Sequence, residues 1–235
     1  MRCELITTGN ELLDGRVLNT NAQFVGQLLV DVHIKLSKVC VIGDDPDDLR
    51  DCFSDCLDRA DVVIITGGLG PTDDDRTVAQ LAAVLGLELV FHQDVLDMIH
   101  TYFNAKNRQM PKINRKQAYL PKGADVIFNS YGTAPGFSLV CQDTFFLCLQ
   151  GVPREMCPLI EEAGLKRIVD FMGLPEQRLS VSCACIGQGE SFLAEKIQSL
   201  MPLPEGFEIS YRASSPEVRL SLSAPYSLKK QFEDL

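Results

Sequence analysis

Several features of common protein classes are missing from this sequence. It has no apolar run of transmembrane length, no internal repeat and no low-complexity segment, so neither a membrane-spanning helix nor a repeat array is expected. Positive charge is scarce, because 22 Lys and Arg stand against 32 Asp and Glu, a net charge of -10. This balance argues against nucleic acid and anionic membranes as partners. No signal-peptide pattern precedes the strand-like residues 1–8, so we expect a cytoplasmic protein.

The nine cysteines form no recognisable metal or redox motif. There is no Cys-x-x-Cys and no Cys/His cluster of zinc spacing, and the three histidines are scattered. Cys52 and Cys56 lie one turn apart on a predicted helix, and Cys183 and Cys185 share one face of a predicted strand, which is typical of packing. We therefore expect reduced, mostly buried cysteines. No Ser/His/Asp or Cys/His catalytic arrangement is supported.

Strand-like and helix-like segments alternate through the first two thirds of the chain. The expected strands are residues 3–7, 34–42, 62–66, 125–128, 137–140 and 144–149, and the expected helices are 20–30, 46–59, 78–86, 93–107, 114–119 and 153–172. This order predicts an α/β fold with a mostly parallel sheet between helices, and ligand binding at the carboxyl ends of the strands. A composition break at Gly173 predicts a first domain over residues 1–172 and a small α+β second domain over 173–235.

The segment from Thr66 to Thr77, TGGLGPTDDDRT, is the most informative part of the chain. A glycine-rich turn between a strand and a helix lets backbone N–H groups approach a phosphate closely. The three carboxylates of Asp73, Asp74 and Asp75 would repel a phosphate unless a divalent cation lay between them. The helix macrodipole would account for one or two acidic residues here, whereas three favour metal-assisted binding or cleavage of a phosphate ester or anhydride.

Other polar turns follow strands that should end at the same edge of the sheet. Glu11 and Asp44 suit a metal or ribose contact. The alternative for Glu11 is an exposed glutamate in a turn, and the alternative for Asp44 is a turn residue next to Asp45, which would cap the following helix. Asn19 and Asn21 flank a helix start that favours capping or anion binding. Further along, the turns over residues 129–137 and 151–156 predict a pocket rim or ordinary hairpin chemistry, and the basic stretch 114–117 predicts phosphate contacts or a solvated helix end.

Six motifs occur in order along the first domain: TTGNELLDGRVLNTNAQF, VIGDD, TGGLGPTDDDRT, NRKQA, YGTAPGF and GVPREM. Together they resemble the N-terminal part of the competence/damage-inducible CinA family. That part belongs to the molybdopterin-binding superfamily, which includes the molybdenum-cofactor synthesis enzymes. GQGES (residues 187–191) and SSPEVRL (214–220) resemble the family's KH-like middle domain, so the resemblance covers essentially the whole chain.

The resemblance implies a three-layer domain of the MoaB/MogA type, a homo-oligomer with a dimer favoured, and hydrolysis of ADP-ribose to AMP and ribose 5-phosphate. The implied cofactor is a divalent metal (Mg²⁺, Mn²⁺ or Co²⁺), with a monovalent cation such as K⁺ as a further candidate. The catalytic candidates are Glu11, Asp44, Asp74 and Asp75, the last three also as metal ligands. The candidate substrate- and phosphate-binding residues, from the motifs and the turns together, are Gly9, Asn21, Thr66, Gly67, Gly68, Gly70, Thr72, Thr77, Arg115, Gly132 and Thr133. Asp73 lies at a variable position and is the least expected to take part.

The chain departs from the family pattern at a few places. Asn10 stands where threonine is more usual, and Gln150 where a proline usually precedes Gly151. The chain ends at Leu235, before the nicotinamide-nucleotide amidase domain of many CinA proteins, so deamidase activity is not expected. Residues 173–235 hold six Lys and Arg against eight Asp and Glu and no Gly-x-x-Gly, so we expect this part to bind no RNA and to serve structure or dimerisation. Two other functions stay open: a molybdopterin-binding or adenylylating protein of molybdenum-cofactor biosynthesis, and a non-catalytic nucleotide-binding module.

Overall fold

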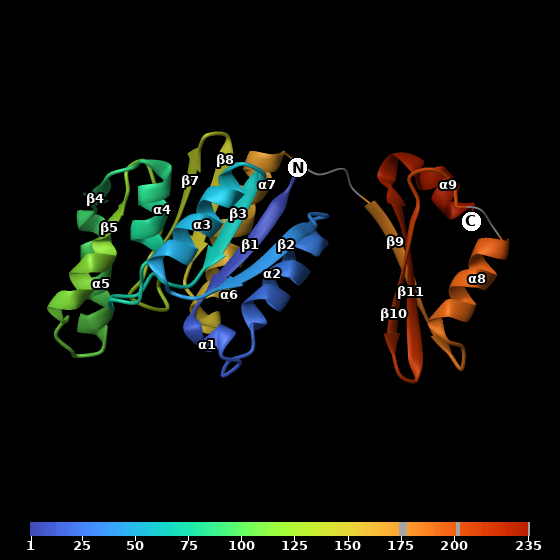
Figure 1. Cartoon of the computed structure of the whole chain (residues 1–235), viewed down its shortest axis with the longest axis horizontal. Coiled ribbons are helices and arrows are strands. Elements are labelled where there is room, and N and C mark those ends of the chain that lie inside the picture. The colour runs from blue at the N-terminus through green and yellow to red at the C-terminus, as the bar shows by residue number, and fades with distance from the viewer. Residues whose placement is uncertain (174–177, 201–202, 235) are drawn as a thin grey trace. The chain divides into compact units, whose positions relative to one another are not determined.

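The computed structural model describes residues 1–173, 178–200 and 203–234 (Figure 1). The chain divides into two compact units, Met1–Leu174 and Pro175–Leu235. Residues 174–177, 201–202 and 235, which belong to the predicted second domain, lie outside the described residues. The last residue of the helix that the sequence predicts over 191–201 is among them. In the described part of the chain, no helix combines the length and the apolar character needed to cross a bilayer.

The first unit is built on a six-stranded sheet of order β2-β1-β3-β8-β7-β6. Its strands are β1 (Cys3–Thr8), β2 (Leu36–Ile42), β3 (Val62–Thr66), β6 (Asp125–Ile127), β7 (Gly136–Cys141) and β8 (Thr144–Leu149). β1 pairs in parallel with β2 and β3, and β3 pairs in parallel with β8, whereas β7 and β6 continue the sheet in antiparallel pairing. The predicted α/β fold with a mostly parallel sheet is therefore confirmed.

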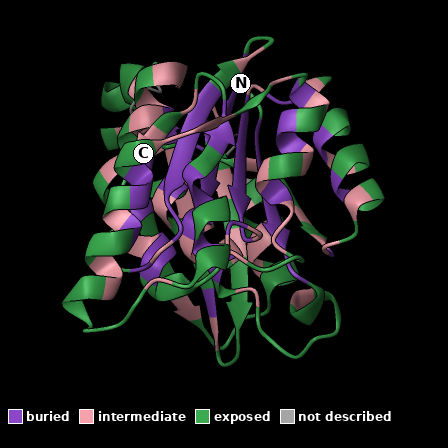
Figure 2. Cartoon of the chain, turned by 90° about the vertical axis from the view of Figure 1, so that its left-hand side faces the viewer, coloured by how far each residue is buried: buried purple, intermediate pink, exposed green. Residues whose placement is uncertain are grey.

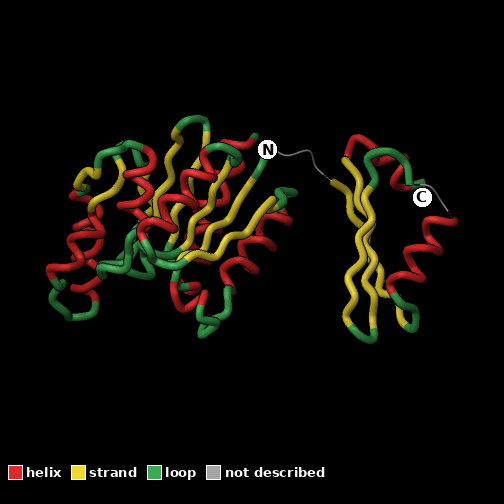
Figure 3. Tube along the Cα trace, in the orientation of Figure 1, coloured by secondary structure: helices red, strands yellow, loops and turns green. Residues whose placement is uncertain are grey.

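Helices cover both faces of this sheet (Figures 2 and 3). The helices of this unit are α1 (Asn10–Leu13), α2 (Thr20–Asp31), α3 (Pro46–Leu57), α4 (Thr77–Leu85), α5 (Gln93–Ala105), α6 (Pro153–Leu159) and α7 (Leu165–Met172). All except the short α1 contribute buried residues. Alternate strand residues enter two separate cores, because side chains along a strand point to opposite faces. Ile6 and Ile65 pack with α3, α4 and α5, and Leu5 and Ile64 pack with α2, α6 and α7.

The predicted helix caps are present, and so is the hairpin that the sequence predicts between the strands 137–140 and 144–149, with its turn at Gln142 and Asp143. Asn19 accepts a hydrogen bond from Ala22 N (3.1 Å) at the start of α2, and Asp45 caps α3. Gln142 and Asp143 both have positive φ, of 50° and 67°, which a tight turn between antiparallel strands requires. These local signals succeed because the interactions involved span only a few residues.

The predicted helix over residues 153–172 is present with the expected ends, but its middle is not α-helical. A π-helical segment, η2 (Ile160–Gly164), separates α6 from α7. Pro158 lies inside α6 and cannot donate a backbone hydrogen bond. Gly164 packs so closely on the sheet that a Cβ there would lie 2.9 Å from Leu147 Cδ2. Helical register is therefore shifted where the chain approaches β8.

The segment between α4 and β6 also differs from expectation. A 3-10 helix, η1 (Lys112–Ala118), replaces the predicted helix over 114–119. The antiparallel pair of β4 (Leu89–Phe91) and β5 (Tyr119–Pro121) was not predicted, because three-residue strands are determined by pairing rather than by a long residue pattern.

The second unit contains a three-stranded antiparallel sheet of order β10-β11-β9. Its elements are β9 (Arg178–Ile186), α8 (Glu190–Leu200), β10 (Glu208–Ser214), β11 (Glu217–Pro225), η3 (Tyr226–Leu228) and α9 (Lys229–Glu233).

All nine cysteines of the chain are free thiols. Cys3, Cys56 and Cys148 are buried, Cys183 is exposed and the rest are half-buried, so the cysteines are less buried than expected.

Candidate active site

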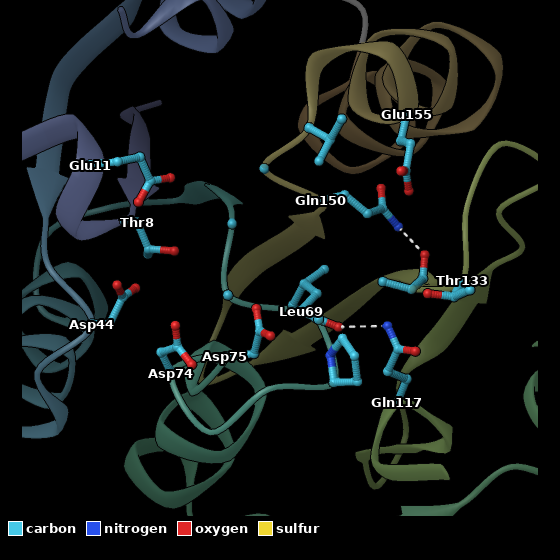
Figure 4. Close-up of a pocket in the computed structure, with 18 of the residues that line it drawn as sticks. Thr8, Glu11, Asp44, Leu69, Asp74, Asp75, Gln117, Thr133, Gln150 and Glu155 are labelled. Atoms are coloured by element: carbon cyan, nitrogen blue, oxygen red, sulfur yellow. Dashed lines mark hydrogen bonds between the residues drawn. The ribbon is translucent and has the colours of Figure 1, made fainter. Parts of the chain in front are cut away.

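A pocket of about 520 Å³ lies at the carboxyl ends of β1, β2, β3 and β8 (Figure 4). The parallel register brings these ends to one sheet edge, since Thr7 pairs with Thr66 and Thr66 with Leu149. The predicted residues that line the pocket are Gly9, Glu11, Asp44, Gly67, Gly68, Gly70, Asp74, Asp75 and Thr133. The other lining residues were not predicted individually, although Ala134, Gly151, Val152, Pro153 and Glu155 belong to the turns predicted as a pocket rim; the rest are Thr8, Val17, Leu69, Pro71, Gln117 and Gln150.

The glycine turn after β3 forms the middle of the pocket wall. Gly67 and Gly68 have positive φ values of 109° and 66°. A Cβ on Gly67 would lie 2.5 Å from the carbonyl oxygen of Thr8, and a Cβ on Gly68 would lie 2.1 Å from Thr77 Oγ1. The positive φ angles and the lack of room for a Cβ atom therefore both require glycine at positions 67 and 68. Without side chains, the backbone of the turn is open to the pocket.

Four carboxylates gather at one end of the pocket (Figure 4). They belong to Glu11, Asp44, Asp74 and Asp75. The pKa of Asp44 is raised above its ordinary value, first by burial and further by the negative charges of Glu11, Asp74 and Asp75, while the backbone N–H of Asn10 acts in the opposite direction. This end of the pocket therefore carries electrostatic repulsion that a cation would relieve.

Hydrogen bonds hold the acidic loops in place. Asn10 N donates to Asp44 Oδ2 (3.1 Å), and Asp44 N donates to Asn10 Oδ1 (3.2 Å), which joins the ends of β1 and β2. Asp75 Oδ2 accepts from Thr72 N (2.9 Å) and from Thr72 Oγ1. Lys116 Nζ donates to the carbonyl oxygens of Thr72 and Asp75. Asp75 thus both lines the pocket and closes the loop that precedes α4.

The aspartate triplet does not lie in the first turn of α4. That helix begins at Thr77, with Arg76 at the N-cap and no acidic residue in its first turn. Arg76 donates to the carbonyl oxygens of Asp73 and Asp44, so the loop is tied to the turn after β2. The macrodipole therefore gives a weaker account of these carboxylates than their position around the pocket.

The acidic end of the pocket could bind a hard divalent cation only if waters or substrate oxygens complete the coordination shell of the cation. Within residues 1–173, 178–200 and 203–234, no three His, Cys, Asp or Glu side chains are grouped to hold a metal ion by themselves. Mg²⁺ is commonly bound by one or two carboxylates together with waters and substrate phosphates. The oxygen donors of Asp44 and Asp74, in a place where carboxylates repel one another, match that type of site.

Some predicted residues lie beside the pocket. Asn21 and Thr66 line an adjoining space of about 60 Å³. Asn21 Nδ2 donates to Gly151 O (2.8 Å), while Asn21 Oδ1 and Thr66 Oγ1 are buried and have no hydrogen-bond partner in the described structure. Two such oxygens suit a water molecule or a small cation. Thr72 and Thr77 support the turn, as described above.

Arg115 is not placed as the sequence predicts. It does not line the pocket, and its guanidinium lies over the ring of Phe91, 4.8 Å from the ring centre. Its neighbour Lys116 reaches the glycine turn instead. Gly132 does not line the pocket either, and a Cβ there would overlap the carboxylate of Glu155. Phosphate binding by Arg115 is therefore not supported by this arrangement.

The end of the pocket away from Asp44 and Asp74 is lined by Gln117, Gln150 and Glu155 (Figure 4). Gln117 Nε2 donates to Leu69 O (3.3 Å) and so supports the glycine turn. GVPREM was predicted as a possible rim, but Glu155 was not predicted individually. An acidic residue in the first turn of a helix is usually explained by the helix dipole, so Glu155 carries no distinct sequence signal. The departure at Gln150 was the only sequence signal at that position.

Comparisons with known proteins agree with this fold. Residues 4–169 match the family model described as a probable molybdopterin binding domain. A molybdopterin biosynthesis protein from Mycobacterium abscessus shares the fold, with a TM-score of 0.50 and 14% identity over 74% of this chain and 95% of that chain. The protein CinA from Thermoplasma acidophilum, described as of unknown function, is 34% identical with a TM-score of 0.65, over 71% of this chain and 98% of that chain.

Curated relatives extend the similarity to the second unit. CinA-like proteins from Escherichia coli O17:K52:H18 and Shewanella frigidimarina are each 35% identical, over 100% and 95% of this chain. The matches cover 58% and 53% of those proteins, so the chain spans little more than half their length. Fold, motifs and similarity together place this chain in the molybdopterin-binding domain family, in its CinA branch.

Proposed function

We propose that this chain is a divalent-metal-dependent pyrophosphatase that hydrolyses ADP-ribose or a similar nucleotide diphosphate to AMP and a sugar phosphate. The observation that carries the proposal is the convergence of a glycine turn and four carboxylates at one end of a single pocket. Its volume of about 520 Å³ is within the usual range for small-molecule sites. A diphosphate would bring negative charge to that end, which only a cation could make favourable.

Each group of pocket residues would have a different role in hydrolysis, according to its position. The turn from Gly67 to Gly70 would bind phosphate oxygens through its backbone. Asp44 and Asp74 would hold Mg²⁺, Mn²⁺ or Co²⁺, which when bound would neutralise phosphate charge and lower the pKa of a coordinated water. Glu11 would accept the proton of the attacking water. The water oxygen then forms a new bond to phosphorus as the bridging P–O bond breaks, and two phosphomonoesters are released.

The test compares two neighbouring aspartates. Asp74 lines the pocket, whereas Asp73 does not, so Asp73→Asn is a matched control for Asp74→Asn. With ADP-ribose and each of the three metals, AMP release measured by chromatography should fall about 100-fold in Asp74→Asn, equivalent to about 2.7 kcal/mol of barrier, and stay near wild type in Asp73→Asn. No AMP with any metal, or equal losses in both variants, would contradict the proposal.

Molybdopterin binding is a second candidate function, favoured by the match of residues 4–169 to the molybdopterin binding domain model. It predicts a pterin retained on purification, seen by fluorescence after oxidation, and binding of molybdopterin in calorimetry. Absence of both would count against it. Nucleotide binding without turnover under all three metals would instead indicate a non-catalytic module.

Assembly as a homodimer and a requirement for K⁺ belong to the first proposal. Light scattering after size exclusion would give a mass of twice 26.0 kDa for a dimer of this chain. Replacing K⁺ by a bulky organic cation in the AMP assay should lower the rate if the space beside Asn21 and Thr66 holds a monovalent ion. An unchanged rate would remove that cofactor from the proposal.

A further inference from the structure

The end of the pocket opposite the acidic residues carries two buried hydrogen-bond acceptors, those of Gln150 and Glu155 (Figure 4). Gln150 is 4% exposed and Glu155 is 9% exposed, and both line the pocket. Gln150 Oε1 has no hydrogen-bond partner within the described structure. Glu155 Oε1 has a cation, Arg154 Nη2, at 3.9 Å, which is too far for a hydrogen bond. This end of the pocket therefore contains two acceptor oxygens, Gln150 Oε1 and Glu155 Oε1, to which a ligand could donate hydrogen bonds.

A hydrogen-bond network fixes the orientation of both side chains. Asn129, which is 1% exposed, donates through Nδ2 to Ala134 O (2.8 Å) and Glu155 Oε2 (2.9 Å). Its Oδ1 accepts from the backbone N–H groups of Tyr131 and Gly132, at 2.8 and 3.0 Å. Every polar atom of the Asn129 amide is thereby used, and one oxygen of Glu155 is held in place.

The same network prevents Gln150 from exchanging its donor and acceptor. Gln150 Nε2 donates to Ala134 O (2.5 Å), which already accepts from Asn129. Rotating the Gln150 amide by half a turn would place Oε1 against this carbonyl oxygen, with no hydrogen between them. The amide oxygen of Gln150 is therefore the atom left for a ligand, and it is the feature that the more usual proline at this position could not provide.

Apolar groups flank these acceptors. Leu69, Ala134, Val152 and Pro153 line the same pocket, and Val152 is 47% exposed. A flat aromatic ring could pack against such groups while its edge meets polar atoms. An exocyclic amino group has two N–H donors on one nitrogen, one for each of the oxygens Gln150 Oε1 and Glu155 Oε1.

We propose that this end of the pocket is a base subsite that binds a heteroaromatic ring through its exocyclic amino group, donated to Gln150 Oε1 and Glu155 Oε1. The inference deepens the proposed function, since the diphosphate would then lie along the glycine turn with the base at one end and the metal at the other. A ring that carries a carbonyl oxygen in place of the amino group is rejected, because it brings an acceptor against two buried acceptors.

The test uses AMP and inosine monophosphate (IMP), which differ at the exocyclic group of the base. In calorimetry with Mg²⁺, the wild-type protein should bind AMP about 10- to 100-fold more tightly than IMP, the range expected for a buried acceptor left unpaired. Glu155→Gln replaces one carboxylate oxygen by an NH₂ donor, so it should strengthen IMP binding and weaken AMP binding. Glu161→Gln, an exposed position outside the pocket lining, should leave both affinities unchanged.

The outcomes separate this inference from the pyrophosphatase proposal. Inorganic pyrophosphate with Mg²⁺ serves as a probe of the acidic end and should bind wild type and Glu155→Gln equally, which also shows that the variant is folded. Equal affinity of the wild type for AMP and IMP, or no AMP binding, would overturn the base subsite even if ADP-ribose is hydrolysed. Discrimination between the two nucleotides without hydrolysis would support the subsite while refuting the enzyme.

Discussion

Alanine at position 68 should destabilise the protein far more than alanine at position 86, although the two glycines have the same φ angle. Both have φ of 66°. A Cβ at Gly86 would meet nothing within 4 Å, whereas a Cβ at Gly68 would lie 2.1 Å from Thr77 Oγ1, 3.0 Å from Thr77 Cβ and 3.2 Å from Thr77 N. Comparing Gly68→Ala with Gly86→Ala therefore separates the free-energy cost of a positive φ angle from the cost of the steric contact with Thr77.

The magnitudes follow from these two costs. A left-handed residue other than glycine costs about 1–2 kcal/mol, and the loss of unfolded-chain freedom returns about 0.4–1 kcal/mol, so Gly86→Ala should cost about 1 kcal/mol. Gly68→Ala adds about 1–3 kcal/mol for overpacking. Thr77 is fully buried and donates its N–H to Gly68 O (3.2 Å). Rotating its side chain would move Oγ1 but not its Cβ or N, so the contacts at 3.0 and 3.2 Å would remain unless the backbone moved and strained that bond.

Urea denaturation followed by circular dichroism would measure both losses in free energy of unfolding. The double variant Gly68→Ala/Thr77→Ala removes the 2.1 Å contact but not the backbone one, so it should cost less than the sum of the single changes. Equal losses for Gly68→Ala and Gly86→Ala, or strict additivity in the double variant, would refute the packing described for the turn.

Three further predictions follow from individual contacts. Arg59→Met should lower the free energy of unfolding by about 3 kcal/mol at pH 7, because it leaves the buried carboxylate of Glu4 unpaired. Burial raises the pKa of Glu4, but the hydrogen bonds and charge of Arg59 outweigh it and the net pKa is lowered. The stabilisation is therefore complete above the ordinary pKa and is lost as the pH falls through the lowered one, so urea titrations of the two proteins should converge in acid. Asn19→Ala should cost about 1 kcal/mol by removing the α2 cap, seen as a lower melting temperature; an unchanged one would contradict the cap. Lys116→Met should speed amide hydrogen exchange in the turn that it holds, while Arg115→Met, which acts on Phe91 instead, should not.

Much of the fold could be predicted from local residue patterns. The run from Val62 to Ile65 is apolar at every position because both faces of β3 are covered. The caps at Asn19 and Asp45 involve partners within three residues. The π-helical segment inside the predicted 153–172 helix was not predicted; it includes Gly164, which packs against Leu147, a residue distant in sequence.

The sequence by itself determined the α/β fold and the gathering of Glu11, Asp44, Asp74 and Asp75, because parallel strands bring the turns that follow them to one sheet edge. Only the tertiary structure decided which neighbouring side chains serve the pocket. It directs Arg115 onto Phe91 and Lys116 onto the glycine turn, and it buries Gln150 and Glu155 at the pocket's other end. Side-chain direction and burial depend on contacts between elements far apart in the chain, which residue types and spacing do not encode locally.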